Sequence, residues 1–244
     1  MDPTLPGRTL DAQYDALWRR FERLSNTTDS LSSWRMRVQR FLTPVNVSFI
    51  IPIEDKAVCD YLGRAQQVLL SYMDYEPQPP DKLHITVYQI GYLRQGRSPF
   101  SGRWTRSQLN PMANLAKDYL QLLRPFTVKV GPINAFPNVP IAEVRDSGRL
   151  RLLRGVLAQS VPRQIVAVNY PLIPHVTLGY FGAQPAAPLR NALRPLRDWK
   201  PIPFTVERVY LTLYYRKPGP YSRKQALLHS VEEVLFSLPI GVTE

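Results

Sequence analysis

Two short stretches, KLHITVYQ (residues 82–89) and IPHVTLGY (residues 173–180), largely determine how this sequence is interpreted. Each contains, in order, a histidine, an apolar residue, a threonine and a second apolar residue. Side chains alternate between the two faces of a strand. The pattern therefore predicts two strands, one with His84, Thr86 and Tyr88 on a single face and one with His175 and Thr177 on a single face.

The repetition of this pattern indicates a function. The 244 residues include three histidines and 12 threonines, so two of three histidines would rarely have threonine at the second following position by chance. The third histidine, His229, is followed by serine and valine. A single histidine on a strand is more often structural. Two in the same frame, 91 positions apart (175 − 84), predict paired half-sites from a duplicated lobe.

The residue types predict acid–base chemistry on a phosphate. Two imidazoles can act together near neutral pH, one accepting a proton while the other donates one. Two threonine hydroxyls are short donors that suit phosphate oxygens. Neither motif contains Asp or Glu, and no H-x-H or H-x-x-x-H spacing occurs. We therefore expect no metal and no cofactor.

HITV (84–87) and HVTL (175–178) resemble the signature of the 2H phosphoesterase superfamily, two H-x-[TS]-x motifs with an apolar last position. The superfamily includes bacterial 2′,5′ RNA ligase-like proteins and cyclic nucleotide phosphodiesterases, and this chain is more similar to a divergent bacterial branch. The resemblance implies an α+β fold in which two pseudo-symmetric lobes of antiparallel sheet, with flanking helices, surround a central cleft. It also implies that His84 and His175 are the acid–base pair and that Thr86 and Thr177 bind the phosphate.

The implied activity is that of a phosphoric diester hydrolase. Its substrate would be the 2′,3′-cyclic phosphate of an RNA end or nucleotide, or ADP-ribose 1″,2″-cyclic phosphate. Two alternatives stay open: a nucleotide- or RNA-binding module with little turnover, and a transferase that joins RNA ends through a 2′,5′ linkage. The sequence does not show which histidine is the base.

The hydrophobic pattern divides the chain into an N-terminal helical extension (1–43, with a helix at 11–24) and a single bilobal domain (44–244). Proline-bounded turns between mixed elements favour α+β with antiparallel sheet over a doubly wound parallel fold.

Segment 91–106 is predicted to be a long loop, and 225–238 fits helix or strand equally well. The remaining predicted strands are 45–53, 83–90, 126–133, 139–144, 175–181 and 204–215, and the helices are 54–73, 108–123, 147–159 (capped by Ser147) and 189–199.

Three further residues are candidates for substrate binding. Tyr88 would share the face of His84, and Tyr210 and Thr212 alternate with leucines in VYLTLYYR (209–216). A group of arginines could add positive potential at the cleft or form an exposed helix face. These are Arg145, Arg149, Arg151 and Arg154.

Composition limits the class of protein and its partners. The net charge is +12, and 24 of the 31 basic residues are arginine, which suits an anionic partner such as a nucleotide or RNA. The single cysteine, Cys59, excludes an internal disulfide framework and a Cys-rich zinc site. Apolar stretches are too short to cross a bilayer, and no secretory signal is visible. We expect a cytoplasmic protein without membrane contact, monomeric by default.

Overall fold

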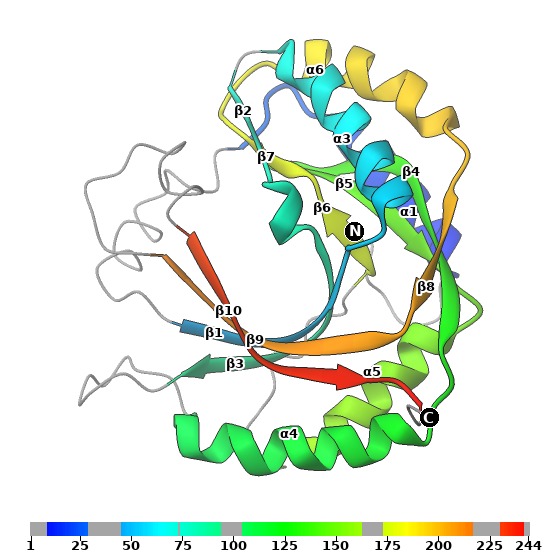
Figure 1. The fold of residues 1–244 in the computed structure, drawn as a ribbon. Coiled ribbons are helices and arrows are strands. Elements are labelled where there is room, and N and C mark those ends of the chain that lie inside the picture. The colour runs from blue at the N-terminus through cyan, green and yellow to red at the C-terminus, as the bar shows by residue number, and fades with distance from the viewer. Residues whose placement is uncertain are drawn as a thin grey trace.

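The fold is built on one curled antiparallel sheet of eight strands in the order β10-β9-β1-β3-β6-β5-β4-β8 (Figure 1). The computed structural model describes residues 9–28, 45–72, 74–93, 104–162, 173–216 and 230–241. A second, two-stranded sheet pairs β2 with β7. The strands are β1 (Val45–Pro52), β2 (Tyr75–Pro77), β3 (His84–Leu93), β4 (Phe126–Phe136), β5 (Val139–Arg145), β6 (His175–Thr177), β7 (Gly179–Phe181), β8 (Ile202–Val206), β9 (Arg208–Arg216) and β10 (Ser230–Pro239).

The sheet has two matching halves that meet at β3 and β6. The first half is β10-β9-β1-β3 and the second is β6-β5-β4-β8, so each half contributes one motif strand to the centre. All the strand pairings within both halves are antiparallel. This arrangement confirms the predicted α+β class with two pseudo-symmetric lobes.

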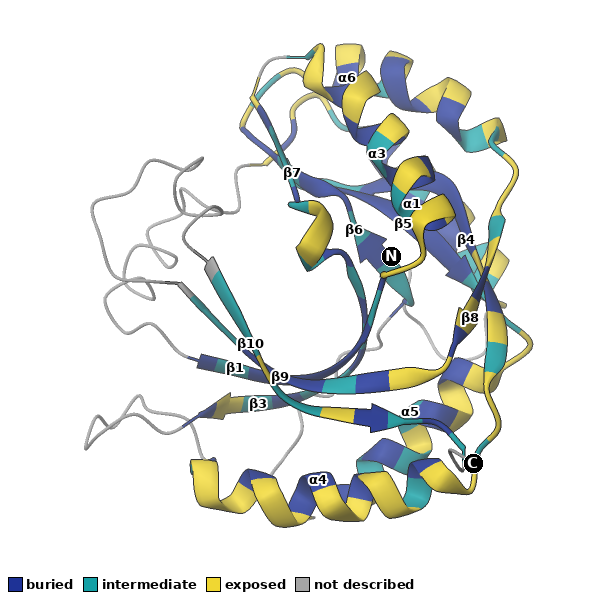
Figure 2. Cartoon of the chain, in the orientation of Figure 1, coloured by how far each residue is buried: buried dark blue, intermediate teal, exposed yellow. Residues whose placement is uncertain are grey.

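Helices cover the outer face of each half. α4 (Arg106–Gln121) and α5 (Arg149–Ser160) lie beneath the first half, and α3 (Lys56–Leu70) and α6 (Ala186–Leu193) lie over the second (Figure 1). Each helix buries one side and exposes the other, as Figure 2 shows. In α3 the buried positions Val58, Tyr61, Leu62, Ala65 and Leu69 recur three or four apart, which places them on one stripe facing the sheet.

The N-terminal helix α1 (Leu10–Glu22) packs on the other, inner face of the second half. Its Tyr14 and Leu17 are buried with Ile141 of β5. Ile141 is the register partner of Thr177, and directly paired residues point to the same face. Helix α1 therefore lies on the face that carries the second motif.

Two predicted strands are each interrupted. The stretch 204–215 forms two strands, β8 and β9, separated at Glu207, and 175–181 forms β6 and β7, separated at Leu178. After Leu178 the chain leaves the main sheet and pairs with β2. Gly179 permits this pairing, because a Cβ there would lie 2.3 Å from the carbonyl oxygen of Glu76.

The predicted Ser147 cap of α5 is wrong. The N-cap residue is Gly148, at φ 90°, and the side chain of Asp146 accepts the Leu150 N–H. A left-handed backbone at this position suits glycine.

The ambiguous 225–238 segment forms strand β10 from Ser230, and residues 225–229 lie outside the described part of the chain. Residues 94–103 of the predicted loop also lie outside it. None of the helices in the described part is long and apolar enough to span a membrane.

Candidate active site

The two motifs are adjacent strands at the centre of the sheet. Ile85 of β3 pairs directly with Val176 of β6 in antiparallel register. In an antiparallel pair, each step forward along one strand corresponds to a step back along its partner. His84 therefore lies opposite Thr177, and Thr86 lies opposite His175. Directly opposed Cβ atoms are about 4.5–5.5 Å apart. Ile85 and Val176 are buried in the core, so the four polar side chains form a compact rectangle on the inner face.

Both histidine rings are fixed by the same backbone contact. Nδ1 of His84 lies 3.0 Å from the carbonyl oxygen of Lys82, and Nδ1 of His175 lies 2.7 Å from that of Ile173. A carbonyl only accepts hydrogen bonds, so each Nδ1 carries a proton. Nε2 is then the basic nitrogen of each neutral ring.

Both imidazoles are biased toward the neutral form. Burial lowers the pKa of His84, against the hydrogen bond to the Lys82 carbonyl, which raises it. Burial also lowers the pKa of His175, and the bond to the Ile173 carbonyl opposes that effect. The charge of His84 lowers the pKa of His175 further.

Glu232 of β10 is a site residue that the sequence analysis missed. Its Oε2 lies 3.7 Å from Nδ1 of His84, and its side chain is 12% exposed. Burial raises the pKa of this carboxyl to about 7. The only sequence signal was an acidic pair within an apolar segment whose secondary structure the pattern left open.

Tyr88 does not share the face of His84 and Thr86, so that prediction is wrong. A β-bulge sets both Val87 and Tyr88 against Phe49 of β1, which breaks the alternation. Tyr88 packs against the hydrophobic core, and the Arg154 guanidinium of α5 lies 5.9 Å from its ring centre. Gln89 takes the inner face instead and donates a hydrogen bond to Asn46 at 3.2 Å.

Tyr210 and Thr212 lie on the inner face of β9, but their hydroxyls have partners. Tyr210 pairs with Ile50, which in turn pairs with Thr86, so Tyr210 stands two strands from the motif. Its hydroxyl donates to Glu54 at 2.7 Å. Thr212 is 2% exposed, and its hydroxyl donates to the Ser48 carbonyl at 3.4 Å. The structure does not bring these two hydroxyls to the motif rectangle.

The arginines singled out in the sequence are not free cations beside the histidines. Arg145 forms ion pairs with Asp11 at 2.7 Å and Glu143 at 2.5 Å. Arg149, Arg151 and Arg154 belong to α5, in the outer helical layer (Figure 1).

Tyr14 links helix α1 to the strand of the second histidine. The register that pairs Glu143 with His175 sets Val144 opposite Pro174, which has no N–H to continue the ladder. The Tyr14 hydroxyl fills this position: it accepts the Val144 N–H at 2.9 Å and donates to the carbonyls of Val144 and Pro174. Tyr14 thereby holds the residue that directly precedes His175.

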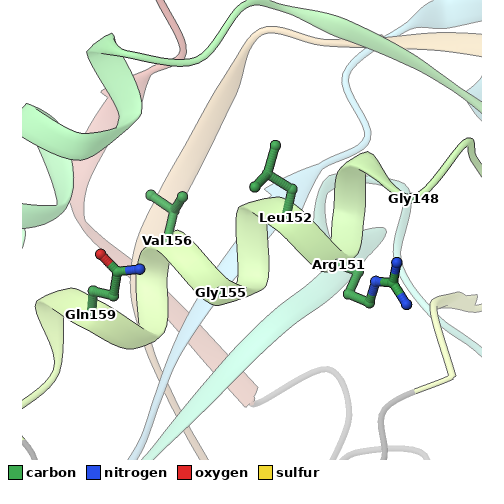
Figure 3. A pocket seen from close by; sticks show the side chains of 6 residues that line it. All are labelled: Gly148, Arg151, Leu152, Gly155, Val156 and Gln159. Atoms are coloured by element: carbon green, nitrogen blue, oxygen red, sulfur yellow. The ribbon is translucent and has the colours of Figure 1, made fainter.

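An open pocket of about 330 Å³ lies along α5 and contains none of the motif residues (Figure 3). Its lining includes Arg151, Leu152, Val156 and Gln159. Within the described residues, no group of three or more His, Cys, Asp and Glu side chains is placed to hold a metal ion.

Comparison with known proteins identifies the family. The model of the 2′-5′ RNA ligase superfamily matches residues 55–218, which include both motifs and more than half of the chain. The chain belongs to this superfamily. No curated protein matches the sequence significantly.

Solved structures support the fold of this superfamily member. TT0787 of Thermus thermophilus is 20% identical with a TM-score of 0.56, and the match covers 81% of this chain and all of that one. E. coli LigT in its apo form is 16% identical with a TM-score of 0.53, covering 82% and 99%. E. coli LigT complexed with 3′-AMP gives the same identity and TM-score, covering 81% and 98%. At these identities the similarity establishes the fold alone.

Proposed function

We propose that this protein is a metal-independent phosphoesterase that hydrolyses a cyclic phosphodiester, with His84 and His175 as its acid–base pair. The observation that carries the proposal is the register of β3 and β6, which sets each histidine opposite the threonine of the other motif. Two basic Nε2 atoms and two hydroxyl groups then belong to neighbouring residues on one face, and a phosphorus centre with charged oxygens can use both kinds of group.

The reaction follows from these groups. One imidazole accepts a proton from water through Nε2 as the water oxygen attacks phosphorus. The other imidazole, protonated at Nε2, donates its proton to the ribose oxygen as the phosphorus–oxygen bond breaks. Thr86 and Thr177 donate hydrogen bonds to the non-bridging oxygens, whose charge grows in the transition state.

The proposed substrate is a 2′,3′-cyclic phosphate on a nucleotide or an RNA end, or ADP-ribose 1″,2″-cyclic phosphate. The LigT complex with 3′-AMP supports a nucleotide, because that ligand carries a phosphate on a ribose oxygen. The net charge of +12 is compatible with RNA. We propose that the enzyme acts in the cytoplasm as a monomer.

The superfamily description also names RNA ligase, which favours 2′,5′ end joining as the second candidate function. The same acid–base pair can run that reaction, with a 5′-hydroxyl in place of water. Supplying an RNA with a 5′-hydroxyl together with the cyclic phosphate distinguishes the two, because joining lengthens the RNA whereas hydrolysis leaves its length unchanged.

The test is chromatographic conversion of 2′,3′-cyclic mononucleotides, of ADP-ribose 1″,2″-cyclic phosphate and of a short RNA with a 2′,3′-cyclic end, with excess chelator. We expect turnover that His84→Ala and His175→Ala each lower by at least about 10²-fold. His229→Ala is the matched control, because His229 lacks the motif. Full activity in either motif variant would refute the mechanism. Tight nucleotide binding without conversion of any diester would favour the binding-module alternative.

A further inference from the structure

The two motif histidines have matching backbone anchors but different surroundings. His84 has a carboxylate beside it, since Glu232 Oε2 lies 3.7 Å from its Nδ1. His175 instead has the Phe136 ring against its edge, with ring centres 5.3 Å apart. Its register partner Glu143 also carries a carboxylate, but that group forms ion pairs with Arg145 and Arg197. Within the described residues, no carboxylate lies within 4.0 Å of a His175 nitrogen.

The Glu232 carboxylate lies in an environment that is unfavourable for a charged group. Its Oε2 is buried and has no hydrogen-bond partner among the described residues. A buried carboxylate oxygen without a donor is unfavourable. Such an atom, directed at a ring of the site, indicates a role beyond packing.

We propose that Glu232 is a positioning residue that stabilises the imidazolium form of His84 and so makes His84 the general acid and His175 the general base. This inference rests on the proposed function and deepens it. Glu232 contacts neither substrate nor phosphorus in this scheme, because it acts on Nδ1 while the proton transfers occur at Nε2.

The charges facing Glu232 fit this role. Lys82 lowers the pKa of Glu232, and Asp81, its neighbour in the 3₁₀ helix η1 (Pro80–Lys82), raises it by less. Tyr214 of β9 is its register partner. A protonated His84 adds a second positive charge, 3.7 Å from the Glu232 carboxylate. The charge that acts on His175, by contrast, is that of His84 itself, which lowers the pKa of His175 and disfavours its protonation.

The proton balance in one turnover is as follows. Water loses a proton to Nε2 of His175 as its oxygen bonds to phosphorus. The ribose oxygen gains the proton of His84 Nε2 as its bond to phosphorus breaks. His175 then releases a proton to solvent and His84 takes one up, with the Glu232 carboxylate favouring uptake at His84.

Two readouts on Glu232→Gln test the inference, since this variant keeps the side-chain shape and removes the charge. The first is a proton NMR titration of the ring signals in a chain with three histidines, assigned with the single His→Ala variants. In the wild type we expect His84 to titrate above His175. In Glu232→Gln we expect the His84 midpoint to fall by at least about one pH unit, because an opposite charge at this range shifts a pKa by about 1–3.

The second readout is the pH dependence of kcat on the cyclic substrate. The loss of activity at high pH, which reports deprotonation of the acid, should begin at lower pH in Glu232→Gln, with kcat near neutral pH reduced about tenfold or more. Glu233→Gln is the control. Glu233 is adjacent but pairs with Arg106 of α4 at 2.9 Å, and this variant should leave both readouts unchanged.

The titration needs no substrate, so it separates this inference from the proposed function. A His84 midpoint within about 0.3 of the wild type in Glu232→Gln would overturn the inference whether or not the protein turns over any diester. The inference would also be overturned if kcat began to fall at the same high pH in Glu232→Gln as in the wild type. The same holds if this pH shifted equally in Glu233→Gln. Inactivity of the wild type on every cyclic substrate would refute the proposed function while the titration still tested the effect of Glu232 on His84.

Discussion

Replacing Tyr14 by phenylalanine removes the one hydroxyl that joins helix α1 to the strands β5 and β6. The ring stays, so the packing of Tyr14 with Leu17, Ile141 and Ile173 is retained. The hydroxyl accepts the Val144 N–H and donates to the carbonyls of Val144 and Pro174. Tyr14 is 0% exposed, and the cavity left by the lost oxygen is too small for water to replace these bonds.

The expected loss of stability comes from the groups left behind. A buried N–H without a partner costs about 1–3 kcal/mol, and the lost bond to a carbonyl adds about 1 kcal/mol. The free energy of unfolding should therefore fall by about 2–4 kcal/mol. For a chain of this size, each kcal/mol lowers the midpoint temperature by about 2–4 °C.

Urea unfolding, followed by the fluorescence of the four tryptophans, measures this change. Tyr119→Phe is the control: Tyr119 is half-buried on α4, and its loss of a hydroxyl should stay within about 0.5 kcal/mol. Turnover should also drop, by about two- to tenfold, because Pro174 directly precedes His175. A Tyr14→Phe variant as stable as Tyr119→Phe would refute the reasoning that Tyr14 completes the ladder.

Two further outcomes follow from single residues. Gly179→Ala should destabilise the protein by about 1–3 kcal/mol in urea unfolding, because its Cβ would meet the Glu76 carbonyl oxygen at 2.3 Å; an unchanged midpoint would contradict the close approach. Thr86→Ala and Thr177→Ala should each lower kcat by about 10²-fold, and Thr→Ser at either position should recover most of it; equal loss in the serine variants would argue against hydroxyl donation.

The sequence predicted the parts of the fold that depend on local periodicity. The helix stripes and the central motif strands follow from spacings of 3.6 and 2 residues, and the repeated frame of His84 and His175 correctly indicated two related halves. The direct opposition of each histidine to the other motif's threonine depends on strand register, which spans 91 positions and has no local signal.

Local periodicity predicts the wrong face where the backbone departs from regular alternation. A single bulge at Val87 turned Tyr88 to the core and placed Gln89 on the inner face. Glu232 was missed for a different reason: its proximity to His84 depends on the curl of the sheet, which brings the last strand near the start of β3. Nothing in the residues around position 232 encodes that curvature.

In the proposed reaction, the duplicated motif creates a chemical problem that the motifs alone do not solve. Two imidazoles with the same carbonyl anchor and the same threonine neighbour would have similar proton affinities, yet net transfer of a proton through a site needs one ring that is charged and one that is neutral. The groups that differ between the halves lie outside the two motifs. Strand β10 supplies Glu232 beside His84, and helix α1 supplies Tyr14 behind Pro174 on the His175 side. The asymmetry of the reaction is therefore expected to arise from the two ends of the chain, and substitutions there should alter the pH profile while both motifs stay intact.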